Sequence, residues 1–196
     1  TLELNILALE NKFRSVEGDS VVYGNYKNGL IEGSYKSYYP NKTLKRESIY
    51  NAGKIVKKID YAENGKKKYE TNYNDKEEME SYDCFDNDGN KYFVEKYKGG
   101  ELKTSFQYTA ANPKGSETSL SKKGFEVKNS DGSERIKGAF EKGKKAGEWT
   151  YLYDSGILRL KESYTNGKTN GVTTNYKSNG TLSSIYHENN DVLDGL

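Results

Sequence analysis

The sequence predicts an all-β chain, an elongated antiparallel meander of tandem β-hairpin repeats that is mostly single-layered and has a period of about 24 residues. Three observations support this fold class. An aromatic residue recurs at nearly constant spacing, and a turn residue, usually glycine, stands eight places before it in most copies. Between the turns, apolar and polar residues alternate, which is typical of half-buried strands.

The aromatic residue that marks the repeat is tyrosine in five copies and phenylalanine in one. The copies begin at Tyr26, Tyr50, Tyr73, Tyr97, Phe140 and Tyr164, at steps of 24, 23, 24, 43 and 24 residues. A repeat of this length is one supersecondary unit that buries its apolar face against its neighbours. Several copies of one small unit favour a surface that binds or spaces something, and they argue against a single catalytic pocket.

The clearest copy spans residues 140–164. Its first strand alternates Trp149, Tyr151 and Tyr153 with other residues, which is the period-2 pattern of a strand with one buried face. Asp154-Ser155-Gly156 then breaks the pattern, and a second alternation leads to the next aromatic residue. One unit is therefore predicted to be a strand, a turn, a second strand and a second turn.

Turn signals place the hairpins in the other copies. The turn residues that stand eight places before a closing aromatic are Lys42, Gly65, Gly89, Gly132 and Gly156. Asn-Gly, Asp-Gly and Gly-Gly pairs recur at the breaks, for example at Asn28-Gly29 and Asn166-Gly167. Such pairs accept positive φ angles, which the tight turns between twisted antiparallel strands require.

The repeat divides the chain into four parts. Residues 1–24 are predicted to be an N-terminal cap, because repeat arrays need terminal elements that close off their ends; the start of this segment fits a strand or a short helix equally well. Residues 25–107 hold repeat units 1–4, and residues 129–196 hold the C-terminal repeat units. Residues 108–128 form either a degenerate repeat or a loop, and the 43-residue step, close to two periods, favours the degenerate repeat.

Composition limits the class of partner and the compartment. Hydrophobic residues make up 33% of the chain, charged residues 31%, and the net charge is only +2, which argues against a nucleic-acid binder. The chain has no apolar run near the ~20 residues that cross a bilayer, so no transmembrane segment is predicted. It begins at Thr1, which fits a removed signal peptide or a cloning choice. An exported or surface-associated location is favoured over a cytoplasmic one.

The residues that most often carry catalysis or bind metal are scarce. Cys84 is the one cysteine, expected to be a small buried hydrophobe, and His187 is the one histidine, expected at the surface. The segment 86–89 with Glu95 partly matches a calcium-loop spacing, but Cys84 occupies the first ligand position and an Asx-type turn is the favoured interpretation. No catalytic residue, metal site or cofactor is therefore predicted.

Residues 147–171, GEWTYLYDSGILRLKESYTNGKTNG, resemble the bacterial variant of the MORN repeat, from which YwqK-type antitoxin-like proteins are built. The resemblance is close over residues 140–179 and extends over residues 26–50 and, in register, over residues 50–97. It implies an all-β array of hairpins that serves protein interaction, in some members as an antitoxin or immunity partner, and often in exported or surface-linked proteins. It implies no catalytic residues.

We therefore expect a non-enzymatic interaction module whose partner is a protein, either a toxin or a surface protein. The predicted binding face is aromatic and consists of Trp149, Tyr151 and Tyr153, with Tyr35 and Tyr39 as the equivalent set. For each of these side chains, the alternative to a role in binding is a purely structural role. Two other functions stay open: a carbohydrate-binding or cell-wall-binding module that stacks sugars on the same rings, and a purely structural spacer.

Overall fold

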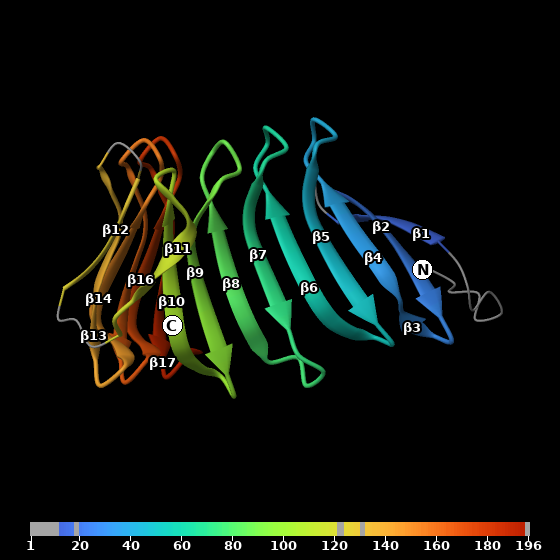
Figure 1. Cartoon of the computed structure of the whole chain (residues 1–196). Helices are drawn as coiled ribbons and strands as arrows, with labels where there is room; N and C mark the ends of the chain where they lie inside the picture. The colour runs from blue at the N-terminus through green and yellow to red at the C-terminus, as the bar shows by residue number, and fades with distance from the viewer. Residues whose placement is uncertain (1–11, 18–19, 121–123, 130–131, 195–196) are drawn as a thin grey trace. The chain divides into compact units, whose positions relative to one another are not determined.

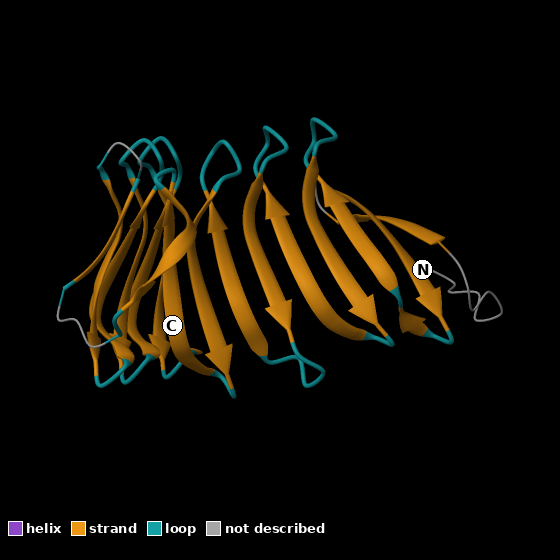
Figure 2. Cartoon of the chain, viewed as in Figure 1, coloured by secondary structure: helices purple, strands orange, loops and turns teal. Residues whose placement is uncertain are grey.

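The computed structural model describes residues 12–17, 20–120, 124–129 and 132–194. It confirms the all-β prediction, because the described residues form strands and no helix (Figures 1 and 2). The strands follow one another as antiparallel hairpins and form two open sheets. The alternating pattern and the turn residues, which act locally, explain the succession of hairpins.

The first sheet runs in the order β1-β2-β4-β5-β6-β7-β8-β9-β10-β11, with β3 paired to β2. Its strands are β1 (Lys12–Glu17), β2 (Ser20–Lys27), β3 (Leu30–Ile31), β4 (Gly33–Tyr38), β5 (Leu44–Asn51), β6 (Lys54–Tyr61), β7 (Lys67–Tyr73), β8 (Met79–Phe85), β9 (Lys91–Lys98), β10 (Glu101–Thr109) and β11 (Asn112–Thr118). The second sheet runs from β12 to β18 in chain order. Its strands are β12 (Phe125–Lys128), β13 (Glu134–Glu141), β14 (Lys144–Leu152), β15 (Leu158–Thr165), β16 (Lys168–Tyr176), β17 (Leu182–Asn189) and β18 (Val192–Asp194).

The chain divides into two compact units. Unit 1 comprises Thr1–Lys91 and Lys98–Gly100, and unit 2 comprises Tyr92–Tyr97 and Glu101–Leu196. In unit 1 the strands form one layer, as predicted. Unit 2 differs, because β9 lies against the second sheet: the ring of Phe93 on β9 meets the ring of Phe125 on β12 with centroids 5.7 Å apart. The large aromatic side chains of this unit are buried only because a second layer covers them. The prediction of a mostly single-layered array did not include this layer.

Two kinds of turn alternate along the sheets. One kind is a two-residue turn in which both residues have positive φ, as in Asn28-Gly29 (51° and 77°) and Asn166-Gly167 (53° and 84°). This is the turn that matches the twist of antiparallel strands, and it was predicted from these pairs. In the other kind, the predicted turn residue has positive φ: 68° at Lys42, 79° at Gly65, 85° at Gly89, 86° at Gly132 and 80° at Gly156.

Asp86 shows how the second kind of turn is held. Its Oδ1 atom accepts hydrogen bonds from the backbone N–H groups of Asp88 (3.0 Å) and Asn90 (2.8 Å). The backbone N–H of Gly89 donates to the carbonyl of Asp86 at 3.0 Å. The prediction of an Asx-type turn here is therefore confirmed, and the carboxylate is occupied by the turn itself.

Some repeats also contact the next one through their turns. A Cβ atom placed on Gly53 would lie 3.2 Å from Leu30, the residue that follows the preceding turn of the same kind, and one on Gly167 would lie 3.4 Å from Lys144. These side chains cover the next turn glycine. Tyrosine hydroxyls also link successive repeats: Tyr153 Oη donates a hydrogen bond to the carbonyl oxygen of Tyr176 in the next repeat at 2.8 Å. The array is thus held by stacked turns as well as by strand pairing.

Removing the Tyr153 hydroxyl tests the stacked turns. We expect Tyr153→Phe to lower the free energy of unfolding by about 0.5–1.5 kcal/mol, the net contribution of one intramolecular hydrogen bond. Tyr39→Phe should behave alike, since Tyr39 Oη donates to the carbonyl oxygen of Tyr61 at 2.8 Å. Urea unfolding followed by circular dichroism measures the loss. Tyr186→Phe is the control, because that exposed side chain makes no such bond within the described residues; an equal loss there would contradict the prediction.

The two segments that depart from the repeat are partly described. Within residues 108–128, of which 121–123 lie outside the described residues, β11 pairs with β10 and β12 pairs with β13. In the predicted cap, residues 1–11 and 18–19 lie outside the described residues. The described remainder includes β1, which pairs with β2 at one edge of the first sheet.

Candidate functional site

Trp149, the first residue of the predicted binding face, is fully buried. Its ring contacts those of Phe125 and Phe140, with centroids 5.2 and 5.1 Å away, and these two rings also contact each other at 5.1 Å. Its Nε1–H donates to the carbonyl oxygen of Ala139 at 3.2 Å. The alternating pattern correctly placed Trp149 on one face of β14. That face is covered in unit 2, so the indole is a core side chain and is not available to a partner.

The other four residues of that set are half-buried and belong to both units. In unit 2, Tyr151 lies beside Lys145, and the hydroxyl of Tyr153 holds the next repeat. In unit 1, Tyr35 packs edge-on against Tyr50 with centroids 6.3 Å apart, and Tyr39 uses its hydroxyl as Tyr153 does. Each of these four side chains makes its contacts within its own unit, and those contacts are structural.

A buried charged cluster lies beside Trp149 in unit 2. The Nζ atom of Lys145 on β14 is 2.8 Å from Oε1 of Glu95 on β9, and the two side chains are only 10% and 5% exposed. Tyr97 Oη donates to Glu95 Oε2 at 2.8 Å, and Lys145 Nζ donates to Tyr151 Oη at 3.2 Å. The ion pair therefore joins β9 to the second sheet. Tyrosine hydroxyls make additional hydrogen bonds to the carboxylate and to the ammonium group of the pair.

The electrostatics of this cluster follow from burial and from close opposite charges. Burial alone would lower the pKa of Lys145, but the charge of Glu95 and the neighbouring tyrosines outweigh it and raise that pKa. The ammonium also lies 4.7 Å from the ring centroid of Trp149 and 5.2 Å from that of Tyr164. These contacts keep Lys145 charged in a nearly dry environment.

Glu162 on β15 is the second carboxylate of the cluster. Tyr164 Oη donates to its Oε2 atom at 2.8 Å. Burial raises the pKa of Glu162, and the hydrogen bond from Tyr164 and the charge of Lys145 only partly oppose this rise. The cluster thus holds one carboxylate paired with a lysine and another whose pKa is raised by burial.

A pH prediction follows for unit 2. A group whose pKa is higher in the folded state contributes stability that is complete below its unfolded pKa and is lost as the pH rises through the folded value. The unmodified chain should therefore lose stability as the pH rises above the ordinary glutamate pKa and through the raised pKa of Glu162. In Glu162→Gln, part of this loss should be absent. Thermal unfolding followed by the fluorescence of Trp149, the one tryptophan, measures this in unit 2. An unchanged pH profile would contradict the assignment.

Unit 1 should show the opposite dependence. Burial alone would raise the pKa of Glu70, but hydrogen bonds from Lys67 (2.7 Å) and Lys57 (2.9 Å) outweigh it and lower that pKa. A lowered pKa contributes stability that is present above the unfolded pKa and lost as the pH falls through the folded one. Hydrogen exchange of strand amides, which resolves local stability, should therefore show unit 1 weakening in acid, and Glu70→Gln should reduce that weakening.

The two residues with the highest reactivity lie where the sequence predicted. Cys84 is buried, with 4% exposure, at a strand position of unit 1. His187 is exposed, and its Nδ1 atom lies 3.6 Å from Asp194 Oδ2 at the surface of unit 2. The described residues contain no group of three or more His, Cys, Asp or Glu side chains placed to hold a metal ion.

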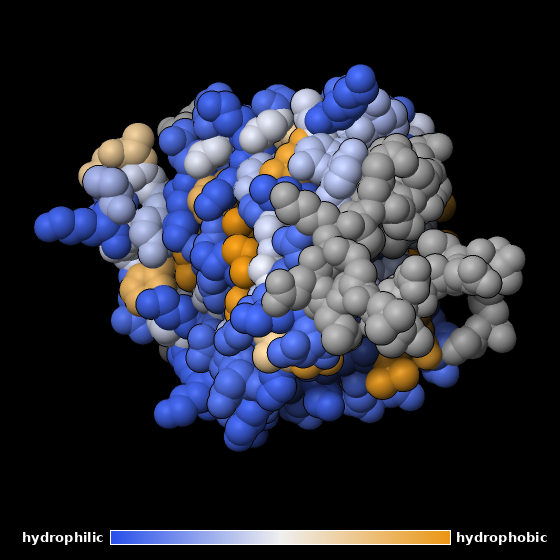
Figure 3. Space-filling model, turned by 90° about the vertical axis from the view of Figure 1, so that its right-hand side faces the viewer, coloured by the Kyte–Doolittle hydropathy of each residue, from blue (hydrophilic) through white to orange (hydrophobic). Residues whose placement is uncertain are grey.

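Exposed apolar side chains, in contrast, are concentrated on the last three strands of unit 2. On the face of the molecule in Figure 3, hydrophilic residues predominate and apolar residues form narrow streaks. The large apolar side chains that are exposed in β16–β18 and the adjoining turn are Val172 (48%), Leu182 (55%), Ile185 (61%), Tyr186 (38%), Val192 (66%) and Leu193 (67%). Elsewhere in the described residues, Tyr23 and Leu30 are the large apolar side chains with comparable exposure.

The register of these strands gathers three of the side chains into one patch. Val172 on β16 is opposite His187 on β17, which is opposite Asp194 on β18. Side chains alternate along strands, so Ile185 and Val192 share the face of His187. We call Val172, Ile185 and Val192, with His187 between them, the outer patch. It lies on the face opposite Thr173, which is buried on the core side.

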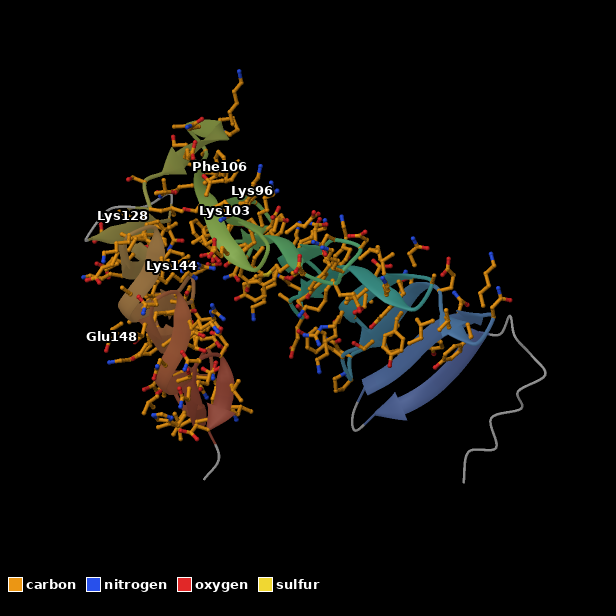
Figure 4. All side chains as sticks on the ribbon, turned by 90° about the horizontal axis from the view of Figure 1, so that it is seen from below. Lys96, Lys103, Phe106, Lys128, Lys144 and Glu148 are labelled. Atoms are coloured by element: carbon orange, nitrogen blue, oxygen red, sulfur yellow. The ribbon has the colours of Figure 1, made fainter. Side chains whose placement is uncertain are left out.

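A group of mostly exposed charged side chains, which we call the charged rim, lies on β9, β10, β12, β14 and β15 of unit 2. Figure 4 shows its labelled side chains on β9, β10, β12 and β14. The contacts are Lys96 Nζ over the ring of Phe106 (5.0 Å), Lys103 to Glu101 (2.7 Å), Lys144 to Glu101 (3.7 Å), Lys128 to Glu126 (3.3 Å) and Lys161 to Glu148 (2.6 Å). Because both signs of charge are present and paired, this rim does not form a one-sign surface for an anionic polymer.

Sequence reasoning missed the outer patch because it ranked positions by aromatic content. The signal that was present is the segment LSSIYHEN of β17, whose apolar residues fall on both faces. In a strand with one covered face, apolar and polar side chains alternate strictly. Apolar residues on both faces therefore indicate a strand that is either covered on both faces or has exposed apolar side chains. All but one residue of β17 is exposed.

Comparisons with known proteins give no family assignment. No family model matches the chain, and no curated protein matches it. Among solved structures, the chain is similar to a chain of the "GtfA/B complex bound to UDP and GlcNAc", with 16% identity and a TM-score of 0.22, over 73% of this chain and 22% of that one. This chain thus spans about a fifth of the length of its match, and at this TM-score the match carries no argument about function. The described part of the chain contains no helical segment with the length and apolar character that a bilayer crossing needs.

Proposed function

We propose that this chain is a non-enzymatic protein-interaction repeat module that binds its partner through the outer patch of β16–β18. The observation that carries the proposal is the concentration of exposed large apolar side chains between residues 172 and 193. On soluble proteins, contiguous exposed apolar surface usually marks an interaction site. The repeats then serve as the scaffold that presents this surface.

The chemistry of the outer patch favours a protein over a sugar. Its apolar side chains, Val172, Ile185 and Val192, are β-branched and stand on a pleated sheet, which suits another flat protein surface. A sugar needs exposed aromatic faces, and the largest ring of the predicted face, Trp149, is enclosed in the core. The carbohydrate-binding alternative therefore depends on tyrosines, of which Tyr23 and Tyr186 are the exposed ones in the described residues.

The buried charged cluster gives no support to an enzyme. Lys145 is paired with Glu95, and Tyr97 and Tyr164 donate to carboxylates of the cluster. Catalytic groups need access to a substrate and unused hydrogen-bonding capacity toward it. We therefore assign this cluster a structural role. For the module itself, the repeat resemblance suggests a toxin-binding or immunity role, so a toxin is the first class of partner to test.

Affinity capture with the chain from lysate and envelope fractions of its host tests the proposal. We expect a protein that is recovered in stoichiometric amount, is lost with Val172→Lys, and is retained with the control Tyr23→Lys, an exposed apolar residue outside the patch. Matching melting temperatures of the variants show that each is folded. Recovery of a glycan without a protein would support the carbohydrate alternative, and a protein that binds Val172→Lys unchanged would exclude the outer patch.

A further inference from the structure

A primary amine and a carboxyl group meet in the buried charged cluster of unit 2. Lys145 Nζ lies 2.8 Å from Glu95 Oε1, and the two side chains are 10% and 5% exposed. This carboxylate oxygen is itself buried and accepts no hydrogen bond within the described residues. The nitrogen therefore touches the carboxylate outside the directions of a hydrogen bond. The carboxyl carbon Cδ is one covalent bond from Oε1, so the nitrogen and this carbon are held close together.

The surrounding side chains restrict the motion of both groups. The ammonium nitrogen lies 4.7 Å from the ring centroid of Trp149 and 5.2 Å from that of Tyr164. It donates to Tyr151 Oη at 3.2 Å, and the second carboxylate oxygen accepts from Tyr97 Oη at 2.8 Å. Two groups that a fold keeps in contact react as if each were present at very high concentration.

Burial also favours a condensation that does not proceed in water. In water, the amine and the carboxylic acid are both ionised, and water hydrolyses the amide that would join them. In a dry core, ions lose their hydration, so the neutral amine and acid become more accessible than in solution. An amide formed there is also kept from hydrolysis, because water is excluded. The ion pair is the resting state of the freshly folded chain, and the reaction that starts from it is therefore expected to be slow.

We propose that Lys145 Nζ and Glu95 Cδ become joined by an amide bond, which links β14 to β9 covalently. One proton first passes from the ammonium to the carboxylate, which gives the amine and the carboxylic acid. The nitrogen lone pair then attacks Cδ, so that a C–N bond forms and a C–O bond breaks. The leaving hydroxyl takes a second proton from the nitrogen and departs as water. Atoms and charge balance without any co-reactant.

Glu162 is placed to assist these proton transfers. It stands opposite Trp149 in the register of β14 and β15, on the face over which the lysine extends. Tyr164 Oη donates to its carboxyl group at 2.8 Å, and burial raises its pKa while the charge of Lys145 acts against that rise. A carboxyl group with a raised pKa holds a proton more readily near neutral pH, and it can pass that proton to the leaving hydroxyl.

Mass spectrometry of the denatured chain tests the proposal. We expect the freshly purified chain to have the mass of its sequence. During long incubation below the melting temperature, a second species should accumulate that is lighter by one water molecule. After digestion with trypsin, this species should contain residues 92–96 joined to residues 145–159, because trypsin does not cleave after a lysine whose side chain is in an amide. Glu162→Gln should form the joined fragments more slowly.

Two controls isolate the chemistry. Lys145→Arg keeps a cation opposite Glu95 but has no primary amine, so it should form no joined fragments. Lys161 and Glu148 form an equally close pair, 2.6 Å apart, but both side chains are exposed, and in water they should stay unlinked. Both controls are followed through the same incubation and digestion.

The peptide map of the unmodified chain decides the outcome, even where Lys145→Arg does not fold. Joined fragments 92–96 and 145–159 would support the linkage. Their absence after the incubation would overturn it. A loss of water confined to the fragment with Asp88-Gly89 would also overturn it, since an aspartate before glycine loses water by closing an imide ring on its own. None of these results depends on the partner of the outer patch.

Discussion

Replacing Lys145 with alanine should lower the free energy of unfolding by about 3–5 kcal/mol, the usual cost of removing one partner from a buried ion pair. The reason is that Glu95, with a side chain only 5% exposed, would keep its charge without the lysine that lies 2.8 Å away. Equilibrium unfolding in urea, followed by circular dichroism, measures the loss. We expect the change in unit 2, where β9 and β14 are joined by this pair.

Two further variants separate the ion pair from the loss of a long side chain. Lys161→Ala removes a lysine from an exposed pair with Glu148, 2.6 Å apart, and should cost no more than about 1 kcal/mol. The double variant Lys145→Met with Glu95→Leu removes both charges and should recover most of the loss, because apolar side chains of similar size avoid the cost of burying charge. If Lys145→Ala costs no more than Lys161→Ala, the buried pair does not hold β9 in place.

The hairpin architecture could be predicted because its determinants are local. Lys42 and Gly65 stand at equivalent places in two repeats, and both adopt positive φ angles. A turn residue fixes where a strand ends, and strict alternation fixes which side chains share a face. Neither requires knowledge of distant residues, so a single sequence is enough to place the strands in order.

The second layer of unit 2 could not be predicted in the same way. Alternation places Trp149, Tyr151 and Tyr153 on one face of β14, but it does not say whether another layer covers that face. The covering strand, β9, comes from an earlier repeat, and the pairing of Glu95 with Lys145 depends on how the chain folds back after β11. A tyrosine on a half-buried strand therefore looks the same in sequence whether its ring is enclosed or exposed.

The outer patch escaped prediction for a related reason. Val172 and Ile185 are unremarkable residues for strand positions, and only the absence of a covering strand makes them exposed. Such an absence is a property of the assembled sheet. The sequence could at most have indicated it through the apolar residues that fall on both faces of β17.

Replacing Trp149 with alanine should cost on the order of 3–5 kcal/mol, because it removes the largest fully buried side chain of the described residues and leaves a cavity beside Phe125 and Phe140. Urea unfolding followed by circular dichroism measures this loss, since the variant lacks tryptophan fluorescence. A small loss would mean that the indole is not the centre of the unit 2 core. Trp149→Phe keeps an aromatic ring and should lose less.

Gly138 provides an independent check of the same packing. A Cβ atom placed on it would lie 2.3 Å from Cδ2 and Cε2 of Trp149, so Gly138→Ala should cost about 1–3 kcal/mol through overpacking. In a chain that already carries Trp149→Ala, the same methyl group enters a cavity, and the cost should fall or change sign. Gly124→Ala is the control and should be close to neutral, because a Cβ atom there meets nothing within 4 Å among the described residues. Additive losses for Gly138→Ala and Trp149→Ala would show that the two positions do not share one packing site, because only direct contact makes the effect of one depend on the other.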